Sequence, residues 1–517
     1  MLTRSSGYAL AAVSGVLLAL SFPRFGHPAI GWIALAPLLV ALSRVPNPES
    51  RAPSPKPRAP SSFTLGLLTG VIYFTGTLYW ITRLMIVYGG MQPLVGVLVN
   101  ALLIAYLALF PALFAVVTRR LVVAHGPSAL MAAPLVWVAT ELGRTHLLTG
   151  FPWVLLGYSQ ATMLPVAQLA SIFGVYGVSA QVAGVSAAAS VWVVADRMSD
   201  RWRALIVGAL PLLVVAVWGS VRAANAEWTR TGESVRVGLI QGNFIEEEKL
   251  DPGQAPRIFR SYVRMTRQAI GSGAQLVIWP EASFPSYFEE DLAAANVVRA
   301  IARQARVPIL LGGDQIERGQ PNQYYNSAFL VRPDGTTAGF YRKMHLVPFG
   351  EYVPLRRLLF FAAPLVKVIG SGFAAGETPT VLAVDGHRLS VAICYEIVYP
   401  NLVRQFVRGG SELLTTITND AWFGRTSAPY QHFAQASMRA IEEGRYLVRS
   451  ANTGISGIVD PYGRVLERSE IYAPAVILGE ARFLHVSTFY ARYGDIFAYA
   501  SVVLTLAMLA LARRRVQ

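Results

Sequence analysis

Cysteine, histidine and charged residues are all scarce in this sequence. Its 517 residues include one cysteine, seven histidines and only 15% Asp, Glu, Lys and Arg. A single cysteine excludes an intrachain disulfide framework and any metal cluster that needs several thiolates. The histidines form no spaced ligand set, so we expect neither a metal ion nor another cofactor.

Hydrophobic residues, in contrast, make up 53% of the chain, which is too many for an ordinary soluble protein. A bilayer is crossed by about 20 mostly apolar residues, and somewhat shorter runs are tolerated. Eight runs qualify, near 7–22, 28–43, 64–83, 92–117, 128–143, 166–195, 204–221 and 495–512. No clear cleavage site follows the first run, which favours a retained span over a signal peptide.

A long segment of mixed composition separates the seventh run from the eighth and is typical of a globular domain. We therefore expect a membrane domain with seven spans at 1–224, an extramembrane domain at 225–485, and an eighth span with a basic tail at 486–517. The multi-pass part is expected to be α-helical.

The net charge of +15 is concentrated beside the apolar runs. No basic helix, RNP-like strand or zinc knuckle accompanies it, so nucleic acid is not an expected partner. One alternate set of loops and tails carries Arg44, Arg51, Lys56, Arg58, Arg119, Arg120, Arg197, Arg201, Arg203, Arg513, Arg514 and Arg515. The other loops carry only Arg24, Arg83 and Arg144. The positive-inside rule then predicts that both termini are cytoplasmic and that the large domain is periplasmic.

Short apolar, β-branched runs alternate with helical stretches in the large domain. Helices are expected near 254–270 and 291–306, and a hairpin at 327–343 around the Asp334-Gly335 turn. Further strand candidates are 235–243, 275–281, 307–313, 387–394 and 412–420. This alternation predicts a layered α/β domain with largely buried strands.

Three of these strands end in residues that carry chemistry. Glu281 ends one apolar run, Lys343 ends the second strand of the hairpin, and Cys394 ends the run 387–394. Catalytic groups in α/β sheets gather at the carboxyl ends of strands. Each residue also has a structural explanation: a charge at a helix N-terminus for Glu281, a solvated strand end for Lys343, and core packing for Cys394.

Together the three residues make a complete catalytic set. A thiol is a useful nucleophile only as a thiolate, and Glu281 would be the base that takes its proton. Lys343 would favour the thiolate and stabilise the oxyanion of a tetrahedral intermediate, helped by the backbone N–H that follows Cys394.

The blocks around these residues resemble a known family. "WPEASFP", "YRKMHLVPFGEYVP" and "ICYEIVYP" are similar to the Glu, Lys and Cys signatures of the nitrilase superfamily. The closer resemblance is to the apolipoprotein N-acyltransferases, its membrane-embedded branch. "TNDAWFG", the following 431–456 block, and the membrane segments "YWITRLMIVYGG", "GFPWVLLGYSQ" and "YARYGD" extend the similarity over nearly the whole chain.

The resemblance implies an α-β-β-α sandwich on an eight-span base in the bacterial inner membrane. It also implies a ping-pong reaction, in which Cys394 takes an acyl chain from a phospholipid, preferably phosphatidylethanolamine, as a thioester. The α-amine of a diacylglyceryl-cysteine at the N-terminus of an apolipoprotein then receives the chain. The resemblance also implies supporting roles for Glu351, Tyr395 and Glu396. Glu351 and Glu396 could instead be buried carboxylates with a purely structural role.

The segment 354–373 is unusually apolar for an extramembrane domain. It is either a buried core helix or an arm that dips Leu358, Leu359, Phe360 and Phe361 into the bilayer and gates entry of the acyl chain. We favour the arm.

Glu141, Arg144 and His146 end the fifth apolar run. Ionisable residues at that depth are often functional, but a self-paired structural cluster is equally consistent with the sequence.

Two other functions are considered. A membrane-anchored amidase acting on a small amide would keep the catalytic set but need no phospholipid. A non-enzymatic lipid-binding scaffold would not need Cys394. The apolar segment argues against the first function, and the intact catalytic set argues against the second.

Overall fold

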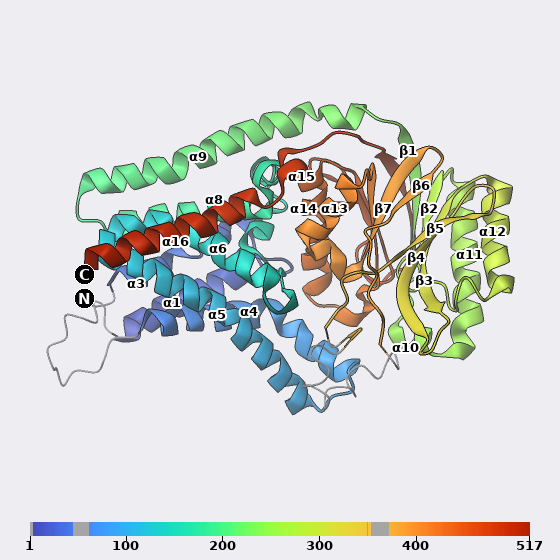
Figure 1. Ribbon diagram of the computed structural model, residues 1–517, viewed down its shortest axis with the longest axis horizontal. Coiled ribbons are helices and arrows are strands. Elements are labelled where there is room, and N and C mark those ends of the chain that lie inside the picture. The colour runs from blue at the N-terminus through green and yellow to red at the C-terminus, as the bar shows by residue number, and fades with distance from the viewer. Residues whose placement is uncertain (1–3, 45–60, 349, 353–371, 517) are drawn as a thin grey trace. The chain divides into compact units, whose positions relative to one another are not determined.

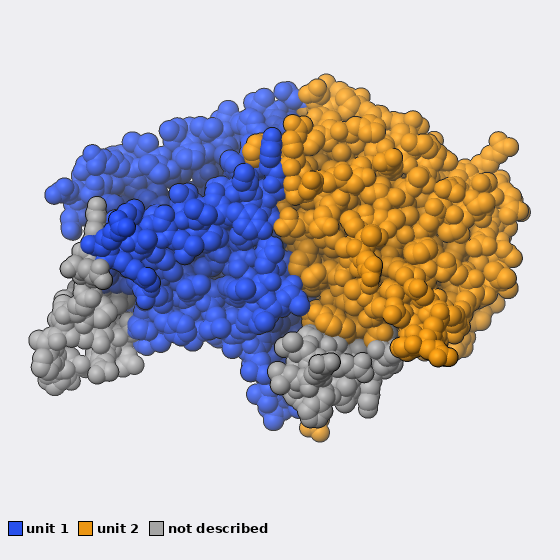
Figure 2. Space-filling model, viewed as in Figure 1, with its two compact units in different colours: residues 1–82, 94–225, 493–517 blue, residues 83–93, 226–492 orange. Residues whose placement is uncertain are grey.

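The computed structural model describes residues 4–348, except 45–60, and residues 350–352 and 372–516 (Figure 1). The chain divides into two compact units (Figure 2). Unit 1 comprises residues 1–82, 94–225 and 493–517, and unit 2 comprises residues 83–93 and 226–492.

Unit 1 is helical. Its elements are α1 (Arg4–Ala19), α2 (Pro28–Gly31), α3 (Ala36–Arg44), α4 (Ser62–Val87), α5 (Pro93–His125), α6 (Ala133–His146), α7 (Leu164–Ala167), α8 (Ala170–Val194), α9 (Met198–Asn225) and α16 (Ile496–Val516). In the described residues, α4, α5, α8, α9 and α16 provide five helices long and apolar enough to cross a membrane. The multi-pass helical character is thus confirmed.

The expected count of eight spans is not confirmed. The run near 7–22 forms the 16-residue α1, and the run near 28–43 divides into α2 and α3. The run near 128–143 begins as the 3₁₀ helix Pro127–Ala132 and continues as the 14-residue α6. Each of these helices is shorter than the length that spans a bilayer alone.

Glu141 and Arg144 anchor the buried loop 150–160. The Glu141 carboxylate accepts hydrogen bonds from Trp137 Nε1 (3.0 Å) and from the backbone N–H of Leu156 (2.7 Å). The Arg144 guanidinium donates to the carbonyl of Trp153 (2.7 Å). These contacts support the structural explanation for the two charges, because they satisfy backbone groups that have no water to bind.

Unit 2 contains two six-stranded sheets. The first has the order β12 (Ala475–Arg482), β1 (Ser234–Gln241), β2 (Leu276–Ile278), β3 (Ile309–Glu317), β4 (Gln323–Val331), β5 (Thr337–Arg342). The second has the order β11 (Val465–Arg468), β10 (Gly457–Val459), β9 (Leu447–Ala451), β8 (Leu413–Thr418), β7 (His387–Ile393), β6 (Val381–Val384). The expected hairpin is confirmed: β4 and β5 pair antiparallel around Gly335, which has φ +83°.

Helices cover the outer faces of both sheets (Figure 1). The amphipathic α11 (Ala255–Gly271) and α12 (Leu292–Ala305) share one apolar core with the first sheet, in which Tyr262 stacks on Trp279. On the other side, α13 (Pro400–Arg408) packs against β7 and α14 (Ala428–Glu443) against β9. The two sheets face each other, since Ser450 of β9 donates to the carbonyl of Ile240 in β1 (2.9 Å). Helices, sheet, sheet and helices are thus stacked in four layers.

Gly312 in β3 allows the chain after β2 to run directly against the sheet. Its carbonyl accepts hydrogen bonds from the N–H groups of Ser283 (2.9 Å) and Phe284 (3.0 Å). A Cβ atom at this position would lie 2.5 Å from the carbonyl oxygen of Pro280 and 2.8 Å from Glu281 Cα. Both contacts are with backbone, so a side chain here would push Glu281 away from the sheet.

We expect Gly312→Ala to displace Glu281 and to slow any chemistry that depends on its carboxylate, without unfolding α11 and α12. The measurement is the rate of Cys394 acylation beside a thermal melt of the purified protein. Gly271→Ala is the matched control, because a Cβ there meets no atom within 4 Å. Equal rates for the two variants would contradict the expectation.

His387, the first residue of β7, contacts the residues that directly precede β8 and β1. Its Nδ1 lies 2.7 Å from the carboxylate of Glu412, its Nε2 lies 3.0 Å from that of Glu233, and its ring stacks on Phe483 at 4.1 Å. Burial lowers the pKa of His387, but hydrogen bonds and charge from Glu412 and Glu233 outweigh it and leave the pKa raised. His485 also approaches Glu412, at 3.6 Å.

Because its folded-state pKa is raised, His387 contributes stability that is fully present below its unfolded pKa of about 6.5. The contribution is lost as the pH rises through the folded-state pKa. We expect the melting temperature of the wild type to fall more steeply than that of His387→Gln over this pH range. Parallel curves, measured in one detergent at constant ionic strength, would contradict this expectation.

Candidate active site

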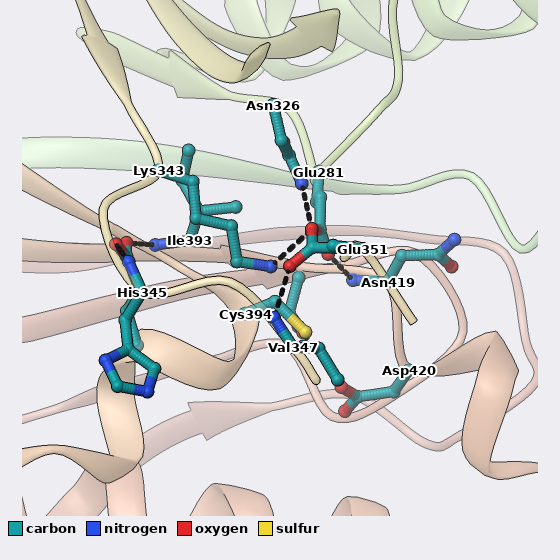
Figure 3. Close-up of polar contacts among 12 residues, drawn as sticks. Glu281, Asn326, Lys343, His345, Val347, Glu351, Ile393, Cys394, Asn419 and Asp420 are labelled. Carbon is teal, nitrogen blue, oxygen red and sulfur yellow. Dashed lines mark hydrogen bonds and ion pairs between the residues drawn. The ribbon is translucent and has the colours of Figure 1, made fainter. Parts of the chain in front are cut away.

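The three strand-end residues of the sequence analysis come together from different sheets (Figure 3). Glu281 lies three residues beyond β2 and Lys343 directly follows β5, both in the first sheet. Cys394 directly follows β7 in the second sheet. Their side chains point toward one another between the sheets. The site is therefore assembled across the sandwich rather than along one edge.

Lys343 is the positive centre of the site. Its side chain is only 1% exposed, and Nζ donates to Glu351 Oε1 at 2.9 Å and lies 3.5 Å from Glu281 Oε1. Burial alone would lower the pKa of Lys343, but the charges of Glu351 and Glu281 outweigh it and raise the pKa well above its usual range. The ammonium is therefore charged at every physiological pH.

Glu281 is held by a donor at each oxygen. Asn326 Nδ2 donates to Oε1 at 2.7 Å, and the backbone N–H of Asn419 donates to Oε2 at 2.8 Å. The Asn326 amide also reaches Glu351 Oε1 at 3.1 Å, and the N–H of Val347 donates to Glu351 Oε2 at 2.8 Å. These donors keep both carboxylates fixed beside Lys343.

Cys394 occupies a tight turn between β7 and the 3₁₀ helix Cys394–Val398. Its φ of +52° lies in the left-handed region, which is costly for a residue with a side chain. Burial and the charge of Glu281 raise the pKa of the thiol, and the ammonium of Lys343 lowers it by less. Lys343 thus favours the thiolate, as the sequence suggested, but burial and Glu281 outweigh it and leave the thiol form favoured.

Glu396 connects the turn at Cys394 to the turn after Lys343. It accepts hydrogen bonds from the N–H of Ile393 (2.7 Å), the Tyr341 hydroxyl (2.7 Å) and the N–H groups of Met344 (2.7 Å) and His345 (3.0 Å). The carboxylate is completely buried, and these four donors occupy its two oxygens. Its geometry is that of a support for two backbone turns rather than that of a base.

Tyr395 belongs to an aromatic group beside the nucleophile. Its ring meets Tyr399 edge-on at 5.2 Å, and His345 packs on Tyr399 at 3.8 Å. Burial and the nearby Lys343 lower the pKa of His345 to about 4, so this histidine is neutral. The group forms an uncharged wall near Cys394.

Several residues in the site were not identified from the sequence. His432 Nε2 lies 3.1 Å from the carbonyl oxygen of Cys394, and its Nδ1 lies 3.1 Å from Asp420. Arg449 in turn binds Asp420 at 2.9 Å. This buried chain holds the backbone of the nucleophile. Asn419 and Asp420 follow β8 directly, so the strand-end rule would have found them, whereas Asn326 within a strand and His432 within a helix give no such signal.

Two further predictions concern the lipid-gating arm and the absence of a metal site. The arm residues Leu358, Leu359, Phe360 and Phe361 lie outside the described residues. Across the described ranges, no group of three or more His, Cys, Asp or Glu residues is arranged to hold a metal ion.

Comparison with known proteins covers both parts of the chain. A carbon-nitrogen hydrolase family model matches residues 236–480, and a model of the apolipoprotein N-acyltransferase N-terminal domain matches residues 14–188. An apolipoprotein N-acyltransferase of Geobacter metallireducens is 41% identical, covering 98% of this chain and 95% of the relative. One of Methylococcus capsulatus is 35% identical, covering 94% and 92%. Since similarity at this level runs through both parts, the chain belongs to the apolipoprotein N-acyltransferase family.

Proposed function

We propose that this protein moves an acyl chain from a phospholipid to the α-amine of the N-terminal diacylglyceryl-cysteine of an apolipoprotein, through a thioester on Cys394. The observation that carries the proposal is the buried cluster of Cys394, Glu281 and Lys343 in a chain that matches acyltransferases over its whole length. The relatives' name supports an apolipoprotein as the acyl acceptor, and the geometry of the cluster supports the roles proposed below.

In the first half-reaction, Cys394 Sγ attacks the ester carbonyl carbon of the phospholipid while Glu281 takes the thiol proton. A base is required because the resting thiol is neutral. The oxyanion of the tetrahedral intermediate is stabilised by Lys343 and by the backbone N–H of Tyr395. The intermediate expels the lysophospholipid alkoxide, which receives the proton from Glu281, and the thioester remains.

In the second half-reaction, the neutral α-amine of the acceptor attacks the thioester carbonyl carbon and gives its proton to Glu281. Collapse of the second intermediate forms the amide and breaks the carbon–sulfur bond. The thiolate leaves and takes the proton back, which restores the resting state. Glu351 acts as a support for Lys343 (2.9 Å) and Glu396 as a support for the two turns.

The remaining expectations are part of the same proposal. The membrane domain at 1–224 and the span at 486–517 hold the catalytic domain at 225–485 against the bilayer that contains both lipid substrates. Both termini are cytoplasmic and the catalytic domain is periplasmic, at the bacterial inner membrane. The preferred donor is phosphatidylethanolamine, and no metal or cofactor takes part.

The two other functions fit less well. An amidase acting on a small amide has no use for a membrane unit with five apolar helices of spanning length in its described part, and the full-length relatives carry the name of an acyltransferase. A scaffold without chemistry does not need the buried ammonium and carboxylates around Cys394.

Incubation of the detergent-solubilised protein with labelled phosphatidylethanolamine tests the proposal. We expect a hydroxylamine-sensitive acyl adduct, which can form only on the single cysteine. Cys394→Ser should give none, and Glu281→Gln should form it about 10²- to 10⁴-fold more slowly, the usual range for loss of a general base. Glu467→Gln, an exposed carboxylate on β11, is the control. No adduct on the wild type, together with turnover of a simple amide, would remove the proposal.

The same cluster predicts opposite shifts in the thiol pKa. Glu281 raises the pKa of Cys394 and Lys343 lowers it. Glu281→Gln should therefore move the pH dependence of iodoacetamide alkylation to lower pH, and Lys343→Met should move it to higher pH. In Glu281→Gln the Cys394 thiol would thus ionise more easily, yet the acyl adduct would form more slowly. Shifts of the same sign in both variants would contradict the assigned geometry.

A further inference from the structure

Two exposed arginines lie beside the segment that follows β8. Neither forms an ion pair in the part of the chain that the structure describes. Arg83 is near the C-terminal end of α4, and Arg425 follows the 3₁₀ helix Asp420–Phe423. Residues 83–93 belong to the same compact unit as 226–492. The Arg83 guanidinium lies directly over Gly424, where a Cβ atom would meet Arg83 Nε at 2.9 Å and Cζ at 3.3 Å. The two cations are therefore neighbours.

Aromatic residues surround this place, and one ring packs on Arg425. The Arg425 guanidinium lies 4.8 Å from the centre of the Tyr472 ring. The hydroxyls of Tyr472 and Tyr88 both donate to the carbonyl of Ala421, at 3.3 and 3.1 Å, and Tyr88 meets Trp422 edge-on at 5.0 Å. Tyrosine and tryptophan with one apolar and one polar end are typical of the interface between membrane and water.

Among the described residues, the nearby carboxylates form no ion pair with the two arginines. Glu247 is exposed and acts on Tyr88 together with Arg83. Asp420 is already bound to Arg449 at 2.9 Å and to His432, and Glu246 accepts from Asn419 at 2.7 Å. Burial raises the pKa of Tyr472, whereas both Arg83 and Arg425 act on it in the opposite direction, as expected if the two guanidiniums face the same ring. A site with two forked donors and no carboxylate paired with them suits a phosphate group.

The pair is also close to the nucleophile along the chain. Thr418 at the end of β8 contacts the Cys394 thiol, and the N–H of Asn419 binds Glu281 at 2.8 Å. From Asn419 the chain continues through a 3₁₀ turn to Gly424, a path of about 10 Å at the rise of such a helix. A glycerophosphate bound here would keep its esters near Cys394.

We propose that Arg83 and Arg425 bind the phosphate of the phospholipid donor and select phosphorylated lipids over neutral glycerides that carry the same esters. This inference rests on the proposed function and assigns the part of the donor that the catalytic cluster does not contact. Arg83 also lies in α4, close to its C-terminal end, so its replacement can change the stability of that helix. The experiment must therefore separate binding of phosphate from stability of the helix.

The test compares three donors with the same acyl chains: dioleoylphosphatidylethanolamine, dioleoylphosphatidylglycerol and dioleoylglycerol, which has no phosphate. The rate of adduct formation on Cys394 is followed by intact mass, at low and high salt. We expect the wild type to prefer both phospholipids, and the double variant Arg83→Gln/Arg425→Gln to lose at least about tenfold on each. Its rate with dioleoylglycerol should change by less than about twofold. The wild-type preference should weaken with salt.

The charge-matched control is Arg260→Gln/Arg267→Gln, two exposed arginines on α11, which should leave the ranking of donors intact. Arg83→Lys/Arg425→Lys should restore part of the preference, because charge is kept and the fork is lost. Thermal melts of all variants report the contribution of helix stability.

Equal slowing with all three donors would overturn the inference, and so would an unchanged ranking in the double variant. Inhibition of the dioleoylglycerol reaction by inorganic phosphate would indicate a site for the free anion instead. These outcomes differ from failure of the proposed function, in which the wild type forms no adduct with any donor.

Discussion

The catalytic site depends on one buried ammonium shared by two carboxylates. Lys343 lies 2.9 Å from Glu351 and 3.5 Å from Glu281, with almost no access to water. Removal of Lys343 would leave two buried carboxylates without a counter-charge in a medium of low dielectric, which costs several kcal/mol. The amide of Asn326 reaches both carboxylates. This set of contacts fixes the two carboxylates and the ammonium relative to one another, because each group is oriented by at least one other.

The second requirement is that two sheets keep a fixed separation. Glu281 and Lys343 come from one sheet and Cys394 from the other, so a small shift of the sandwich would separate base from thiol. Glu396 prevents that shift locally, since one carboxylate receives donors from both turns. On the opposite side, His432 holds the carbonyl of Cys394. The reactive turn is thus clamped from both directions.

Sequence patterns predicted the meeting of Glu281, Lys343 and Cys394 better than they predicted the membrane part. Glu281, Lys343 and Cys394 were found because polar residues directly after apolar strands are conspicuous. Asn326 was not, because it lies within a strand and its partners, Glu281 and Glu351, are distant in the sequence. The run at 128–143 is apolar enough to suggest a span, yet Glu141 and Arg144 are used to hold the loop 150–160. Hydropathy alone does not distinguish a crossing from a shorter helix with a buried loop beside it.

The burial and the raised pKa of the Cys394 thiol affect how readily this residue is oxidised. Oxidation to sulfenic acid follows thiolate character and exposure, and this sulfur is buried and neutral at rest. No second cysteine exists to repair an oxidised nucleophile through a disulfide. The same burial that raises the pKa of Cys394 therefore shields the only thiol from irreversible oxidation.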